Sequence, residues 1–94
     1  MEPELVRARA VVRGRVQMVG FRAFVQRHAA NAALSGTVRN AHDGTLEADL
    51  QGPRDAVESL IALLHRGPSA ARVDRVDVEY LSPSGALPPM RVTA

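Results

Sequence analysis

The stretch LVRARAVVRGRVQMVGFRAF, residues 5–24, decides the fold because its periodicity changes part-way along. Apolar and arginine side chains alternate over Leu5–Arg13, which predicts a β-strand with one buried face. A loop follows over Gly14–Gly20. From Phe21 the apolar residues recur three and four positions apart, which predicts an amphipathic helix. The stretch therefore predicts a strand, a loop and a helix in that order.

The predicted helix buries a stripe made of Phe21, Phe24, Val25, His28 and Ala32, and Gly36 suits its C-terminal end. The remaining patterns predict strands over 37–41, 45–51, 76–80 and 90–94, a turn at Asp43-Gly44, and a helix over 53–66. The order is βαββαβ with a short extra strand. Both helices have one apolar side, so we expect them on one face of an antiparallel sheet. This is the ferredoxin-like α+β sandwich, in a single domain over residues 1–94.

The composition restricts the function. The chain has 12 basic residues, all of them arginine, a net charge of +2 and no cysteine. Without cysteine there are no disulfides, thiol nucleophiles or thiolate metal sites, and a reducing compartment is expected. No signal peptide and no apolar run near the roughly 18 residues of a membrane span are found. We expect a cytoplasmic monomer that does not bind membranes. Aromatic residues make up 3% of the chain, so no nucleic-acid partner is expected.

The topology predicts where a site would lie. The strands before and after the first helix run parallel with another strand between them, so their C-terminal ends share one edge of the sheet. The first helix begins at that edge, and its free N–H groups and dipole favour an anion there. Arg22, in the first helical turn, adds a planar cation that matches phosphate oxygens. The second of these strands ends near Asn40.

Two motifs at this edge resemble the acylphosphatase family. Residues 14–22, GRVQMVGFR, are similar to the family signature GRVQGVGFR, and residues 36–40, GTVRN, followed by Gly44, are similar to its second signature. The resemblance implies hydrolysis of small acyl phosphates to carboxylate and phosphate, by direct attack of water and without metal or cofactor. It assigns phosphate binding to Arg22 and the attacking water to Asn40. It also implies a phosphate cradle of backbone N–H groups from Arg15, Val16, Gln17, Met18, Val19 and Gly20.

The side chains predicted at this site agree with such chemistry. An asparagine amide does not titrate and arginine stays protonated, so neither can act as a general base or acid. An acyl phosphate needs no acid, because its leaving carboxylate has a pKa of roughly 4. We expect a phosphate oxygen of the substrate to accept the proton of the water.

Two residues depart from the family pattern. Met18 stands where the signature has glycine, and a positive φ there would cost about 1–3 kcal/mol. Thr37 replaces an aromatic residue, which affects local packing and could alter the substrate lining.

Two other functions fit the same fold. The first is a non-catalytic phosphate- or anion-binding regulatory module, which would bind phosphate without turnover. The second is an RNA-binding domain that uses the face bearing Arg7, Arg9 and Arg13, a face that otherwise serves only as the solvated side of a strand. The three histidines show no metal-ligand spacing, so we predict no metal site; His28 is expected to pack on the apolar face of its helix, His42 to lie in a turn and His65 at an exposed helix end.

Overall fold

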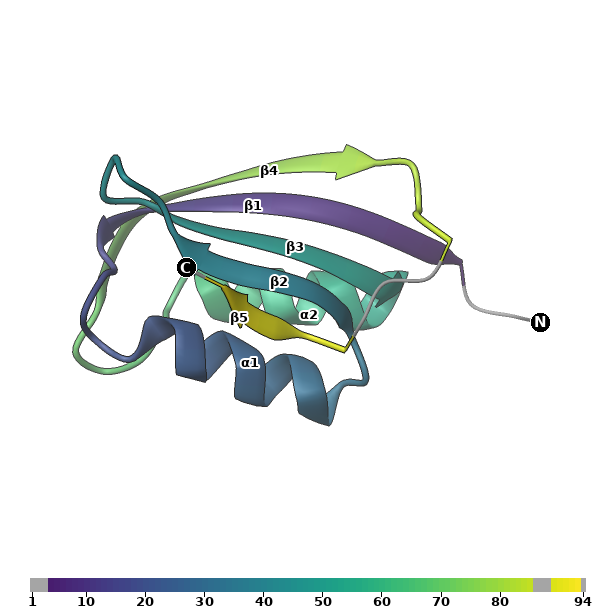
Figure 1. The fold of residues 1–94 in the computed structure, drawn as a ribbon, viewed down its shortest axis with the longest axis horizontal. Helices are drawn as coiled ribbons and strands as arrows, with labels where there is room; N and C mark the ends of the chain where they lie inside the picture. The colour runs from purple at the N-terminus through teal and green to yellow at the C-terminus, as the bar shows by residue number, and fades with distance from the viewer. Residues whose placement is uncertain (1–3, 86–88, 94) are drawn as a thin grey trace.

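The computed structural model describes residues 4–85 and 89–93, which form one sheet and two helices. In chain order the elements are β1 (Leu5–Arg15), α1 (Phe21–Asn31), β2 (Ser35–Asn40), β3 (Leu46–Pro53), α2 (Arg54–Leu64), β4 (Arg72–Leu81) and β5 (Arg91–Thr93). The strands lie in the order β4-β1-β3-β2-β5 (Figure 1). Neighbours are antiparallel except for β5, which runs parallel to β2. The ferredoxin-like α+β fold is confirmed, with a mixed sheet. The extra strand is also confirmed, although position 94 of its predicted range lies outside the described residues.

One face of the sheet carries the core. The alternation along β1 and β3 places their small and branched apolar side chains under the helices, where they are fully or almost fully buried: Val6, Ala8, Ala10, Val12, Leu46, Ala48 and Leu50. Helix α1 packs on β2 and β5, and α2 packs on β1 and β3. Each helix closes the core with one apolar stripe: Phe21, Val25 and Ala29 from α1, and Val57, Leu60 and Leu64 from α2. The predicted buried face of β1 and the predicted apolar side of α2 are thereby confirmed.

The end predicted for the first helix is wrong. Helix α1 stops at Asn31, Ala32 is exposed, and Ala33 turns the chain with a left-handed φ of 56°. Gly36 lies inside β2 and not at a helix end. Its φ is 136°, and a Cβ atom there would lie 1.7 Å from the carbonyl oxygen of Asp49 on β3. Glycine is required here because the two strands approach each other closely, not because a helix ends.

Other elements also begin or end at residues different from those predicted. β1 continues two residues past its predicted end, because Gly14 still pairs with β4, through an irregular register. Gly14 has a φ of 133°, and a Cβ atom there would lie 2.2 Å from the Arg72 carbonyl oxygen. β4 begins four residues earlier than the alternation suggested, and α2 is shorter at both ends. The side chain of Gln51 on β3 is buried through its contacts with Ser84: it donates to the Ser84 carbonyl (2.9 Å) and accepts from the Ser84 N–H (2.7 Å).

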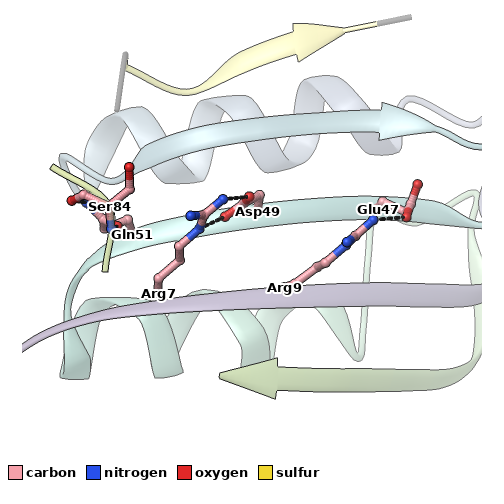
Figure 2. A network of polar contacts seen from close by, with 6 residues as sticks. All are labelled: Arg7, Arg9, Glu47, Asp49, Gln51 and Ser84. Atoms are coloured by element: carbon pink, nitrogen blue, oxygen red, sulfur yellow. Dashed lines mark hydrogen bonds and ion pairs between the residues drawn. The ribbon is translucent and has the colours of Figure 1, made fainter. Parts of the chain in front are cut away.

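The sheet face away from the helices carries paired charges (Figure 2). Arg7 binds Asp49 through two hydrogen bonds of 2.9 and 2.6 Å, and Arg9 binds Glu47 at 2.9 Å. Arg13 pairs with Asp77 at 3.1 Å. Each of the three arginines that would serve an RNA-binding face is thus paired with a carboxylate, as expected of a solvated strand face, although Glu47 also pairs with Arg39 and Asp77 with Arg75.

Candidate active site

The loop between β1 and α1 leads into an uncapped helix. Gly20 precedes α1 with a left-handed φ of 81°, and its carbonyl accepts the first helical hydrogen bond, from the Phe24 N–H at 3.0 Å. No side chain caps this end, and the first turn holds no acidic residue. The N–H groups of the first turn therefore have no partner within the helix, and the positive end of the helix dipole is not neutralised. This end of α1 is suited to an anion.

A pocket of about 240 Å³ opens at this point. Residues from the loop, the start of α1, the end of β2 and β5 line it: Val16, Met18, Gly20, Phe21, Arg22, Ala23, Gln26, Asn40 and Val92. The structure thus brings Arg22 and Asn40, which are 18 positions apart in sequence, to one cavity. Arg22 is half-buried and has no ion-pair partner in the part of the chain that the structure describes. Its guanidinium is available to an anionic ligand.

Asn40 ends β2, where it pairs with Leu46 on β3. Its side-chain oxygen Oδ1 is buried and has no hydrogen-bond partner among residues 4–85 and 89–93. A buried acceptor without a partner costs free energy, and such atoms are commonly found at functional sites. The pocket therefore offers one fixed cation and one unused acceptor that can hold a hydroxyl or water proton.

Not all of the expected cradle lines the pocket. Val16, Met18 and Gly20 do, whereas Arg15, Gln17 and Val19 are not among the lining residues. Arg15 is the last residue of β1 and pairs with Arg72 on β4. The backbone role of the whole stretch remains a prediction.

The side chain of Gln17 has a role that the sequence interpretation missed. Its Nε2 donates to the backbone carbonyls of Ala41 (2.7 Å) and Thr45 (3.0 Å), on the turn between β2 and β3. These bonds tie the loop to the residue that directly follows Asn40. The signal was present in the sequence, because Gln17 is the single uncharged hydrogen-bonding side chain between Gly14 and Gly20.

The turn that follows Asn40 is itself held rigidly. Asp43 Oδ1 accepts from the Thr45 hydroxyl (2.6 Å) and the Thr45 N–H (3.1 Å). The hydroxyl bond, followed by the backbone bond, lowers the pKa of the Asp43 carboxyl below its ordinary value. Both bonds favour the ionised form, so the turn is most stable when Asp43 is charged.

The two departures from the family pattern have different consequences. Met18 adopts φ 61°, so its backbone is strained as anticipated for a positive φ, and its side chain is fully exposed. Thr37 lies on β2 beside the buried Val38 and is not among the pocket-lining residues. Its effect is therefore on the sheet surface and not on the site.

The donor set of the pocket contains no carboxylate and no imidazole. Within the described ranges, no group of three or more histidine, cysteine, aspartate or glutamate side chains could hold a metal ion. His28 is half-buried and packs edge-on against the Phe24 ring at 4.6 Å, His42 lies in the exposed turn, and His65 caps α2. These placements confirm the structural interpretation of all three histidines.

The acylphosphatase family model matches residues 8–87. The chain belongs to the acylphosphatase family. It is 45% identical to the acylphosphatase of Salinibacter ruber, covering 92% of this chain and 90% of the relative. It is 53% identical to that of Caldivirga maquilingensis, covering 79% of each. The crystal structure of the Bacillus subtilis acylphosphatase superposes with a TM-score of 0.91 at 31% identity, covering 95% of this chain and 99% of that one. An acylphosphatase from Coxiella burnetii gives 0.89, also at 31% identity, covering 95% of this chain and 93% of that one.

The activity of this chain, its substrate class and its products follow from its membership of the acylphosphatase family. The chain is an enzyme that hydrolyses the carboxyl–phosphate bond of acyl phosphates, with a carboxylate and inorganic phosphate as products. The sequence prediction of an acylphosphatase is confirmed at this level. No helix among the described residues is long and apolar enough to cross a membrane.

Proposed function

We propose that the pocket at the start of α1 hydrolyses small acyl phosphates by direct attack of water on phosphorus, without a metal ion. Arg22 and the backbone amides of the loop hold the phosphoryl group, and Asn40 holds the water. The observation that carries this proposal is that Arg22 and Asn40 line one pocket, and that the buried Asn40 Oδ1 has no hydrogen-bond partner among the described residues.

The phosphoryl end of the substrate fits the charge of the pocket. A planar guanidinium can donate two parallel hydrogen bonds to phosphate oxygens. The free N–H groups of the first turn of α1 add neutral donors and the helix dipole adds partial positive charge. Together they stabilise the negative charge that the equatorial oxygens carry in the transition state.

Asn40 would orient the nucleophile. Its Oδ1 can accept one proton of a water molecule, which directs an oxygen lone pair of that water toward phosphorus. Because Asn40 ends a paired strand and the following turn is fixed by Asp43, the backbone that carries the amide is held in place before the substrate arrives. Holding two reacting atoms in the correct geometry lowers the activation barrier without any proton transfer to the enzyme.

The lack of titratable lining groups favours this substrate class. No side chain of the pocket can take the proton of the water at neutral pH, so we assign that role to a phosphoryl oxygen of the substrate. The leaving carboxylate needs no protonation. A pocket without carboxylate or imidazole also lacks the ligands that Mg²⁺ or Zn²⁺ require, which supports hydrolysis without metal.

Steady-state hydrolysis of benzoyl phosphate with EDTA present tests the proposal. We expect chelator-insensitive turnover, a kcat about a hundredfold lower in Asn40→Ala, and much smaller change in inhibition by phosphate. Asn31→Ala, at the exposed end of α1, is the matched control. Arg22→Ala should lose both phosphate binding and turnover, Arg22→Lys should recover little of either, and Arg27→Ala on the exposed side of α1 should lose neither.

Three results would contradict the proposal. Equal loss of kcat and phosphate affinity in Asn40→Ala would exclude water positioning. A bell-shaped rate profile with a catalytic pKa near neutrality would reveal a general base. Phosphate binding without turnover by the folded wild type would favour the regulatory module.

The cellular setting is also a proposal. We propose a cytoplasmic monomer, which fits a chain without cysteine and a pocket formed within one chain. Light scattering coupled to size exclusion tests the monomer, and a dimer mass would refute it.

A further inference from the structure

Two apolar side chains that line the pocket are exposed to solvent, Met18 almost completely and Val92 in part. Met18 is 99% exposed, and Val92 on β5 is 39% exposed. They come from segments at opposite ends of the chain, yet both line the cavity that contains Arg22 and Asn40. Exposed apolar side chains that gather beside a polar pocket commonly mark a ligand contact.

Met18 is costly to the fold in its present position. A left-handed φ of 61° is unfavourable for any residue with a Cβ, and the exposed side chain recovers nothing by burial. Glycine would avoid the strain, so the methionine side chain is the feature that needs an explanation. Methionine is unbranched and polarisable, and it adapts to apolar groups of different shape.

The acyl group of the substrate is an apolar group that the exposed Met18 side chain can contact. An acyl phosphate has a charged phosphoryl end and an acyl end, and Arg22 with the α1 N-terminus fixes the charged end inside the pocket. The acyl group must then project toward the mouth, where Met18 and Val92 lie.

We propose that Met18 and Val92 form an apolar lip that contacts the acyl group, so that the enzyme favours larger apolar acyl groups over acetyl. This inference rests on the proposed function of the pocket. The lip determines specificity and takes no part in bond breaking.

The test compares benzoyl phosphate with acetyl phosphate. Met18→Gln keeps the length and flexibility of the side chain and the backbone constraint, and Val92→Thr keeps the shape. In the double variant we expect the ratio of kcat/KM for benzoyl over acetyl phosphate to fall by about fivefold to tenfold. This is the factor expected when roughly 40–50 Å² of apolar surface is no longer covered by apolar groups. Val78→Thr is the matched control, because Val78 is 37% exposed on β4 and does not line the pocket.

A ratio equal to that of the wild type would overturn the proposal. Equal loss for both substrates, together with weaker inhibition by phosphate, would also overturn it, because Met18 would then act through the phosphate loop. Calorimetric binding of benzoylphosphonate and acetylphosphonate, which cannot be hydrolysed, gives a ratio of affinities for the two acyl groups without turnover, and we expect it to fall in the double variant too. If the wild type hydrolyses neither acyl phosphate, the proposed function is refuted. The ratio of the two phosphonate affinities then shows by itself whether the lip contacts the acyl group.

Discussion

Replacement of Gln17 by leucine should separate the stability of the loop from its function. Gln17 Nε2 donates to two backbone carbonyls, and each carbonyl keeps a second partner: Ala41 accepts from the Gly44 N–H, and Thr45 accepts from the Ala41 N–H. Gln17→Leu therefore leaves neither acceptor without a hydrogen bond, and its cost is the net value of two bonds. At about 1 kcal/mol each, we expect a loss of about 2 kcal/mol in the free energy of unfolding.

The same substitution should lower activity, because the loop would no longer be fixed to the turn beside Asn40. A displacement of about 1 Å between the phosphoryl site and the water site lowers kcat by about tenfold to a hundredfold. Gln51→Leu is the matched control. Gln51 also makes two hydrogen bonds to backbone, but its partner is Ser84 and not the turn beside Asn40. Urea unfolding measures stability, and benzoyl phosphate hydrolysis per folded molecule measures activity.

The expected pattern is a similar loss of stability in both variants and a loss of kcat in Gln17→Leu alone. If Gln17→Leu kept the wild-type kcat while losing stability, its bonds would be structural only. If Gln51→Leu lost as much kcat as Gln17→Leu, the loss would follow from general destabilisation, and the positional argument would fail.

Three further predictions concern stability. Gly36→Ala should cost more than about 4 kcal/mol, because its Cβ would overlap the Asp49 carbonyl; Gly85→Ala, with nothing within 4 Å, should stay within about 1 kcal/mol by urea unfolding. Leu64→Ala, fully buried, should lower the free energy of unfolding by about 2–5 kcal/mol, whereas half-exposed Leu5→Ala should change it by less than about 1 kcal/mol. The lowered pKa of Asp43 should stabilise the fold above about pH 4, and this contribution should vanish as pH falls through the folded-state pKa. Asp43→Asn should therefore unfold at lower urea than the wild type at neutral pH, and the difference should close in acid; a difference independent of pH would refute the assignment.

The sequence predicted the elements well where burial dictates periodicity. The alternation of Val6, Ala8, Ala10 and Val12 survives in the structure because one face of β1 is covered and the other is not. Chain turns were predicted less well. The left-handed residue after α1 is Ala33, which has no intrinsic preference for that conformation, while the nearby Gly36 serves a close strand contact. The role of Gly36 depends on where β3 lies, which no local pattern reveals, whereas Ala33 turns the chain as the Leu34 N–H bonds back to the Ala29 carbonyl at 2.9 Å.

The site, too, could be predicted in part: its location followed from the sequence, but its detailed contacts did not. The topology alone predicted that the loop, Arg22 and Asn40 meet at one edge of the sheet, and they do line one pocket. The φ of Met18 could not be read from its side chain, because methionine disfavours the conformation that it adopts. The sequence marked Gln17 as a hydrogen-bonding side chain in the loop, but it did not reveal its partners, which lie 24 and 28 positions away. Val92 was missed because β5 contributes to the site only through its pairing with β2.

The position of β5 has a practical consequence for handling the protein. Val92 on β5 lines the pocket, so a label or surface linker attached to this strand would begin beside the substrate entrance. Leu5 stands at the other end of β1, roughly 33 Å from the strand end that leads into the loop. Immobilisation through the N-terminal side would leave the entrance open to solution, and a sensor surface prepared that way should report substrate binding that the opposite orientation would mask.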